Sequence, residues 1–201
     1  MLQNFTDLLP LISYNPADEI VFYSQNGTGV GGRFVVLETG FQDPAADGAG
    51  TYSNATPGFD YQGVTNVRYE NKRKFRLAPG GVDKASVLGI TMYGTAEFDQ
   101  NGQKLIFLPN RKTELGVVTS GETSNILTDG LIRLSARAYS GTPIPGYVGL
   151  ISTAGNGTIQ IFDPATLPAT GRASASNAVV KVLSSSGSAF GGYADFKLIL
   201  G

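Results

Sequence analysis

From residue 64 onward the chain is a succession of short β-type runs, and this pattern constrains the fold more than any other feature of the sequence. The runs are rich in Val, Ile, Leu, Phe and Tyr, as in "KFRLA", "KLIFLP", "LGVVTSG", "YVGLISTAG", "GTIQIFD" and "AVVKVLSS". Turn clusters such as "APGG", "DQNGQ", "SGTPIPG" and "AGNG" separate them. Short strands with turns at intervals of roughly 8–12 residues are typical of β-sandwiches and β-barrels. We therefore expect an all-β fold, built as an antiparallel β-barrel or sandwich.

Alternation of side chains within the runs supports this prediction. In "ADFKLIL", Phe196, Leu198 and Leu200 recur at every second position and share one face of a strand. Apolar residues make up 41% of the chain and charged residues only 15%. Closing a sheet on itself would remove unpaired edges, which matters for a chain this apolar.

The first third of the chain has a different texture. The runs "EIVFYSQ" (19–25) and "RFVVLET" (33–39) are two further strand candidates, and the glycine-rich connection between them predicts a β-hairpin. Residues 42–63 form a long segment rich in Gly, Pro, Ala and Asn, which is typical of a functional loop or one packed by its own aromatic residues. We expect two parts: an N-terminal arm, hairpin and loop over residues 1–62, and a β-domain over residues 63–201.

Residues 1–17 are apolar but interrupted by Pro10, so we expect one short helical turn or an extended arm. Two arrangements remain open for this segment. It packs on its own domain, or it docks on a neighbouring molecule.

Gly27, Gly29 and Gly32 match the G-x-G-x-x-G fingerprint of dinucleotide-binding loops, and Asp47 follows at the expected distance. That fingerprint functions only where its last glycine begins a helix whose N–H groups face a pyrophosphate. Here Gly32 leads into "RFVVL", whose residues favour a strand. The pattern therefore indicates a turn between strands and no nucleotide site.

Cys, His and Trp are all absent. The usual ligands of zinc, iron–sulfur and haem sites are therefore missing, as are the Ser-His-Asp and Cys-His nucleophile systems. We expect no enzyme activity, no cofactor and no metal. The chain contains no run of 18 apolar residues that would span a membrane, and its first residues lack the basic region of a signal peptide. We therefore expect the protein to be made and retained in a cytoplasm.

Glu97 and Asp99 are two positions apart and would share one face of a strand, as the carboxylates of a glycosidase might require. The same stretch, "EFDQNGQ", is ordinary chemistry for a strand end followed by a tight turn. A glycosidase therefore stays an alternative to the turn.

The net charge of −1 is unevenly distributed, because residues 1–67 contain one basic and seven acidic residues. The densest positive charge lies in "RYENKRKFRL", with basic residues at Arg68, Lys72, Arg73, Lys74 and Arg76. This run suits contact with an acidic protein surface or a solvated strand edge. One basic cluster in a weakly acidic chain is only weak evidence for nucleic-acid binding, so we expect no direct contact with nucleic acid.

The order of the later runs resembles the small β-barrel head decoration (capsid cement) proteins of tailed bacteriophages. The likeness covers roughly residues 64–201 and consists of a "VLGI" strand, a "VTSGE" turn, a "DGLIRL" strand, a "GTPIPG" link, an "AGNGTI" hairpin and a final pair, "VVKVLSSSG" and "YADFKLIL". The resemblance implies a non-enzymatic protein on the virion exterior. Such a protein binds the major capsid protein, associates with itself, often as a homotrimer, and bridges neighbouring coat subunits.

On this hypothesis three groups of residues contact coat or neighbouring subunits: Phe5, Leu8 and Leu9 in the arm; Tyr52, Phe59 and Tyr61 in the long loop; and Arg68, Lys72, Arg73, Lys74 and Arg76 in the basic run. Two further alternatives remain. One is a tail or baseplate β-domain. The other is a carbohydrate-binding β-sandwich in which Tyr52, Tyr61 and Tyr69 stack on sugars.

Overall fold

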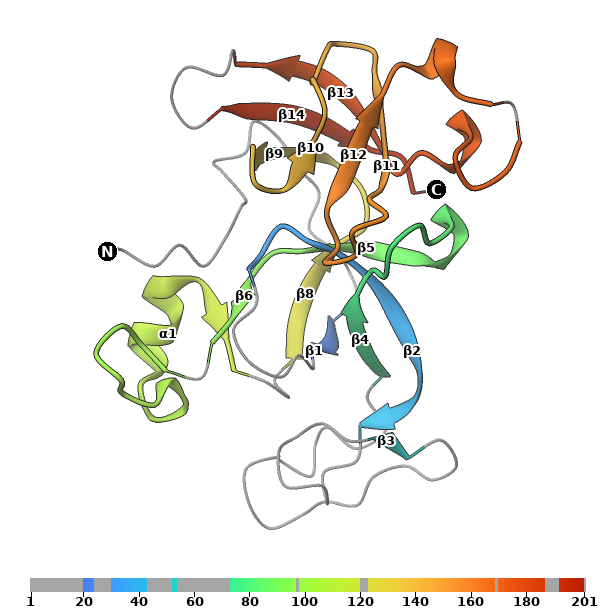
Figure 1. Cartoon of the computed structure of the whole chain (residues 1–201). Helices are drawn as coiled ribbons and strands as arrows, with labels where there is room; N and C mark the ends of the chain where they lie inside the picture. The colour runs from blue at the N-terminus through green and yellow to red at the C-terminus, as the bar shows by residue number, and fades with distance from the viewer. Residues whose placement is uncertain are drawn as a thin grey trace.

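The computed structural model describes residues 20–23, 30–42, 52–53, 73–96, 98–119, 123–168, 170–186 and 192–200. Strands dominate these residues, so the predicted all-β class is confirmed. Two six-stranded sheets form the body of the protein, and a small lobe projects from one of them (Figure 1).

The first sheet curls into a ring. It contains β1 (Ile20–Tyr23), β2 (Phe34–Gln42), β3 (Tyr52–Ser53), β4 (Arg73–Leu77), β5 (Val87–Thr91) and β8 (Thr123–Leu127). The strand order is β3-β2-β4-β1-β8-β5, and an additional pairing of β2 with β5 closes five of the strands into a ring. The expected closure is therefore found in this sheet.

Gly89 permits this tight closure. It lies opposite Val35 of β2, while a Cβ atom added to it would come within 2.5 Å of the Leu127 carbonyl oxygen of β8. Real Cβ atoms do not approach a backbone oxygen that closely, so only glycine fits where β5 lies between β2 and β8.

The second sheet is open and has the order β10-β12-β11-β13-β14-β9. Its strands are β9 (Leu131–Ser135), β10 (Tyr139–Ser140), β11 (Val148–Ile151), β12 (Ile159–Phe162), β13 (Val180–Ser185) and β14 (Tyr193–Leu198). Most pairings in the two sheets are antiparallel, but β1 with β4 and β10 with β12 are parallel.

The main hydrophobic core lies between the two sheets. Side chains from the outer face of the ring pack against side chains from the second sheet, and the largest fully buried members are Phe34, Ile90, Leu127, Ile132, Leu134, Ile159 and Phe196. The opposite face of the ring strands turns inward, where Val35, Phe75 and Ile126 form a smaller cluster. The alternation along β2 thus supplies both cores.

Three backbone hydrogen bonds link Phe34, Ala78 and Gly157 where β2 begins, and the two made by Gly157 join the second sheet to the ring. Phe34 N–H donates to Gly157 O (2.9 Å), Gly157 N–H donates to Ala78 O (3.2 Å), and Ala78 N–H donates to Phe34 O (2.8 Å). Gly157 has a φ of 65°, and a Cβ atom there would lie 2.4 Å from the Phe34 carbonyl oxygen. This junction therefore depends on glycine for its backbone conformation and for its close approach.

Two expectations about local structure are wrong. The strands predicted around residues 19–25 and 33–39 exist, but they do not form a hairpin, because β4 lies between β1 and β2 in the sheet. The run "KLIFLP" is not a strand either. It forms a 3-10 turn, Leu105–Phe107, followed by helix α1 (Pro109–Leu115).

The expected boundary at residue 62 stays a prediction, since residues 54–72 lie outside the described part of the chain. Strands from both sides of that position share the ring, because β2 pairs with β4 and β5. No described helix is long and apolar enough to span a membrane.

Candidate functional site: an apolar lobe beside the ring

The connection from β5 to β8 leaves the ring and forms the lobe. We define the lobe as residues 92–119, with strands β6 (Gly94–Thr95) and β7 (Val117–Val118) at its base and α1 at its far side (Figure 1). The two strands pair in parallel. Helix α1 begins with Pro109 at its first turn and ends at Gly116, whose φ of 63° is the left-handed conformation common at helix ends.

The lobe has a small interior of its own. Leu105 is fully buried and packs with Ala96 and Val117. Because Leu105 occupies this interior, its two successors on the 3-10 turn are left outside. Ile106 is 39% exposed and Phe107 is 77% exposed.

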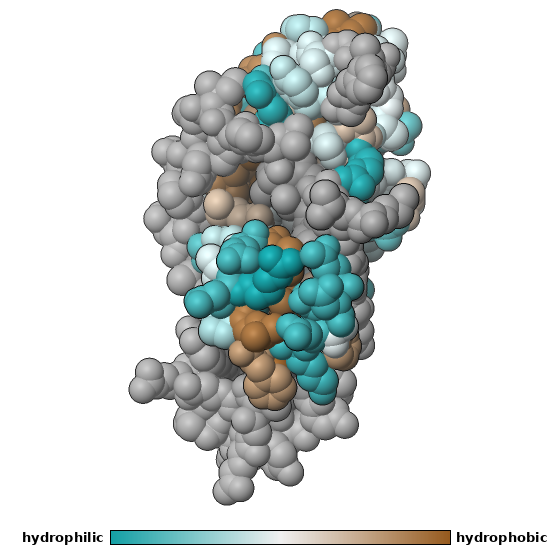
Figure 2. Space-filling view, turned by 90° about the vertical axis from the view of Figure 1, so that its left-hand side faces the viewer, coloured by the Kyte–Doolittle hydropathy of each residue, from teal (hydrophilic) through white to brown (hydrophobic). Residues whose placement is uncertain are grey.

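Two more aromatic residues of the lobe are also exposed. Phe98 is 46% exposed and lies opposite Lys104 in an antiparallel bridge, and Tyr93 is 38% exposed. We call Tyr93, Phe98, Ile106 and Phe107 the lobe face. In Figure 2, which views the lobe side of the molecule, apolar residues gather in a patch bordered by hydrophilic ones. Aromatic side chains exposed together are typical of protein contact surfaces.

Asp99 has a structural role in this lobe. Its carboxylate oxygen Oδ1 accepts hydrogen bonds from the backbone N–H groups of Asn101 and Gln103, both at 2.8 Å. The turn interpretation of "DQNGQ" is therefore confirmed for Asp99. Glu97, the other carboxylate of the glycosidase alternative, lies outside the described residues.

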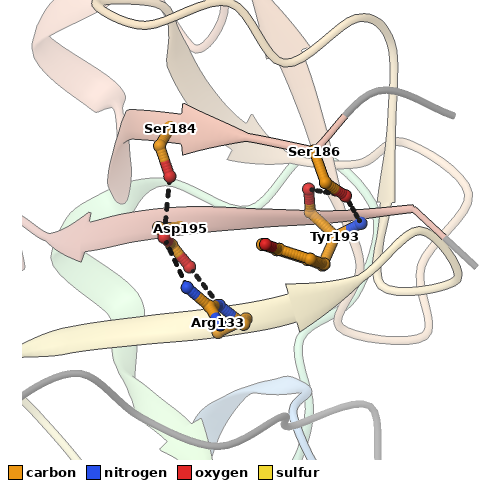
Figure 3. Close-up of polar contacts among 5 residues, drawn as sticks. All are labelled: Arg133, Ser184, Ser186, Tyr193 and Asp195. Atoms are coloured by element: carbon orange, nitrogen blue, oxygen red, sulfur yellow. Dashed lines mark hydrogen bonds and ion pairs between the residues drawn. The ribbon is translucent and has the colours of Figure 1, made fainter.

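Apart from the lobe, a cluster of polar side chains lies on the face of the second sheet that is turned away from the core (Figure 3). Arg133 of β9 and Asp195 of β14 are directly opposite each other and form two bonds, Nε to Oδ1 at 2.6 Å and Nη2 to Oδ2 at 3.0 Å. Ser184 Oγ donates to Asp195 Oδ2 at 2.7 Å, and the Arg133 guanidinium lies 4.3 Å from the centre of the Tyr193 ring.

These contacts determine how the pair titrates. The hydrogen bonds from Arg133 hold the pKa of Asp195 below its usual range, and the Asp195 carboxylate raises the pKa of Arg133. Both oxygens of Asp195 are engaged within the sheet. The cluster therefore joins β9, β14 and β13 and offers no free carboxylate for chemistry.

The structure places the other predicted residues as follows. Arg76 of β4 is exposed beside the buried Phe75. Tyr52 lies in β3, while Arg73 and Lys74 lie in β4, but the side chains of these three are outside the description. The remaining candidates also lie outside the described residues: Phe5, Leu8, Leu9, Phe59, Tyr61, Arg68, Lys72, and Tyr69 of the carbohydrate alternative.

The long loop of residues 42–63 and the basic run both contribute strands to one end of the ring. Phe41 of β2 pairs with Ser53 of β3 on one side and with Arg73 of β4 on the other. Because β4 lies between β2 and β1, the basic run is not at a strand edge along residues 73–77. The edge interpretation of these residues is therefore wrong.

The glycine fingerprint also has a structural explanation at its last position. Gly32 has a φ of 81° and its N–H donates to Thr91 O, after which β2 begins at Phe34. A strand therefore follows this glycine in place of the helix that a dinucleotide site requires. Gly27, Gly29 and Asp47 lie outside the described residues. Within the described part of the chain, no three acidic residues gather as a metal site would need.

The lobe face is not among the contact residues that the sequence pattern predicted. The available signal was the adjacent pair Ile106 and Phe107 in "KLIFLP", next to the polar turn "DQNGQ" and before Pro109. Comparison with protein-family models gives no match to the chain, and comparison with curated protein sequences gives none.

Proposed function

We propose that this protein is a non-enzymatic structural protein that binds the outer surface of a tailed-phage capsid. It would bind the major capsid protein, associate with itself as a homotrimer, and stabilise the head by bridging neighbouring coat subunits. The order of strands and turns that resembles head decoration proteins supports this proposal. The observation that carries it is the lobe face.

The lobe face has the features of a contact surface. Three of its members have large apolar side chains, Phe98, Ile106 and Phe107, and Phe107 is 77% exposed. Burying a Phe side chain against a partner contributes roughly 1.5–3 kcal/mol. Symmetry-related copies that bind one particle together would multiply that modest contribution.

The body of the protein suits the same role. Its two sheets share one core and are joined by the hydrogen bonds around Gly157. Such a body holds the lobe on a rigid support, which reduces the entropy lost on binding.

The test is co-sedimentation of the full chain with purified heads that lack it. We expect the wild-type chain to pellet with the heads. We expect Phe107→Ser to reduce the bound fraction at least tenfold, because the most exposed apolar side chain of the lobe face is removed.

Ile144→Ser is the matched control. Ile144 is 44% exposed and lies outside the lobe, in the connection between β10 and β11. The Ile144→Ser variant should bind heads like the wild-type chain. A wild-type chain that stays in the supernatant would refute the capsid proposal, and equal binding by Phe107→Ser would refute the role of the lobe face.

A further inference from the structure

The outer face of the second sheet, the side that carries Arg133 and Asp195, also carries two lysines directly opposite each other. Lys181 of β13 pairs with Lys197 of β14, and both side chains are exposed. Like charges at directly opposed positions of an antiparallel pair destabilise the sheet. The fold therefore contains a repulsion that a single substitution would remove.

The surroundings of the two lysines do not neutralise them. The same row of the sheet continues into Val148 on one side and Leu131 on the other, and both are apolar. Asp195 shares this face, but its two oxygens are already bound by other side chains of the sheet. Asp129 borders the same surface hollow as Lys197. Even so, neither lysine forms an ion pair with any residue that the structure describes.

Protection of a sheet edge does not explain these lysines either. Lysines commonly discourage edge-to-edge pairing when they lie on an outermost strand. The strand order β10-β12-β11-β13-β14-β9 places β13 and β14 inside the sheet, with β11 and β9 as their other neighbours. Two uncompensated positive charges in the interior of an exposed sheet surface are expected where a negatively charged partner binds.

A β-bulge adds an apolar side chain to the same surface. The register of β13 against β14 shifts between Val182 and Ser184, which makes Leu183 the extra residue. Leu183 follows Lys181 by two positions and therefore shares its face, where it is 42% exposed. Ser184 also points outward, since its hydroxyl binds Asp195. Bulges often re-aim a side chain in this way. An exposed leucine beside unpaired lysines suits a protein surface better than the phosphates of a nucleic acid.

We propose that Lys181, Leu183 and Lys197, here called the lysine surface, bind an acidic segment of a partner protein. Carboxylates of the partner pair with the two lysines, and an apolar side chain beside them packs on Leu183. Bound carboxylates also relieve the repulsion between the lysines. Figure 1 shows β13 and β14 at the top of the molecule and the lobe at the lower left, so one copy can contact two partners at once. The lysine surface is separate from the lobe face, and the inference does not depend on the capsid proposal.

Binding of a glutamate-rich peptide to the full chain tests this inference without heads present. The probe is a fluorescently labelled poly-L-glutamate peptide, and its anisotropy at low ionic strength measures binding. We expect the wild-type chain to bind the peptide and Lys197→Glu to bind it at least fivefold more weakly, because the substitution places a carboxylate on the lysine surface. Lys104→Glu is the matched control, since it makes the same change of net charge at an exposed lysine of the lobe. It should bind the peptide like the wild-type chain.

Thermal unfolding of Lys197→Glu provides the second measurement. The substitution replaces a repulsion with Lys181 by an attraction, so Tm should rise by roughly 1–4 °C. Weaker binding together with a more stable fold separates a contact role from a structural one, because damage to the fold would lower both.

Three results would overturn the proposal: no binding of the peptide by the wild-type chain, equal binding by Lys197→Glu, or a Tm that does not rise in that variant. A single-stranded oligonucleotide that binds more tightly than the peptide at the same salt concentration, and is lost in Lys197→Glu, would assign the surface to phosphate instead. A chain that binds the peptide as expected but does not pellet with heads would refute the capsid proposal and leave this inference intact.

Discussion

The two-sheet body and the lobe use apolar side chains in opposite ways. In the body, Phe34 and Phe196 are at most 1% exposed and pack between the ring and the second sheet. In the lobe, Phe98 and Phe107 are exposed, whereas Leu105 packs with Ala96 and Val117 in a small interior. Burial of the first pair stabilises the fold, whereas the second pair contributes little to folding and remains available to a partner. The difference predicts that substitutions in the core of the body change stability much more than substitutions of the exposed lobe residues.

The largest expected effect is the loss of a core side chain. Phe196 is fully buried, and its ring meets the ring of Tyr139 edge-on at 5.6 Å. Phe196→Ala should lower the free energy of unfolding by about 3–5 kcal/mol, because it removes buried area and leaves a cavity. Chemical denaturation measures this change. A loss below about 1 kcal/mol would contradict the division between body and lobe.

The next effect concerns the junction between the sheets. Gly157→Ala places a Cβ atom 2.4 Å from the Phe34 carbonyl oxygen and forces a left-handed conformation on a residue with a side chain. We expect a loss of about 2–4 kcal/mol. Gly146→Ala is the matched control, because Gly146 has a φ of 94° but a Cβ atom there meets no atom within 4 Å. Equal losses would show that the clash at the junction is unimportant.

A smaller effect is expected on the outer face of the second sheet. Asp195→Asn removes the charge that Arg133 binds, and should lower Tm at pH 7 by roughly 2–6 °C. Because the pKa of Asp195 is lowered in the folded state, its stabilisation is present above about pH 4 and disappears as the pH falls through the folded pKa.

Thermal unfolding of both proteins across pH checks the sign of this linkage. The difference in Tm between wild type and Asp195→Asn should shrink in acid. A difference that stays constant down to pH 2 would mean that the ion pair does not contribute.

The smallest effect on stability is expected for the lobe face. Phe107→Ser should change the free energy of unfolding by no more than about 0.5 kcal/mol, because the side chain is 77% exposed. Chemical denaturation beside Phe196→Ala measures the contrast. A large loss for Phe107→Ser would place this residue in the folding core and break the comparison.

The sequence predicted the body better than the lobe for a physical reason. Alternation in runs such as "ADFKLIL" follows directly from one buried face, and β14 has Phe196 and Leu198 in the core as expected. Pairing partners are not encoded so locally. In the sheet, β4 lies between β1 and β2, because strands distant in sequence compete for the same edges. The glycine-rich link between β1 and β2 gives no signal of this strand order.

The lobe was harder to predict because its apolar residues follow neither the two-residue period of a strand nor the 3.6-residue period of a helix. Leu105, Ile106 and Phe107 are consecutive, and a run of this kind fits a buried strand as well as a 3-10 turn. Only the position of Leu105 in a small interior leaves the other two outside. Pro109 and Gly116, the residues at the two ends of α1, were the overlooked signals of a helix.

Cryo-electron microscopy of heads carrying the bound protein tests the central claim most directly. We predict many copies on the head exterior, each with Phe98, Ile106 and Phe107 buried against a coat subunit. The claim would be contradicted by a density in which the lobe points into solvent, or by a few copies confined to the tail.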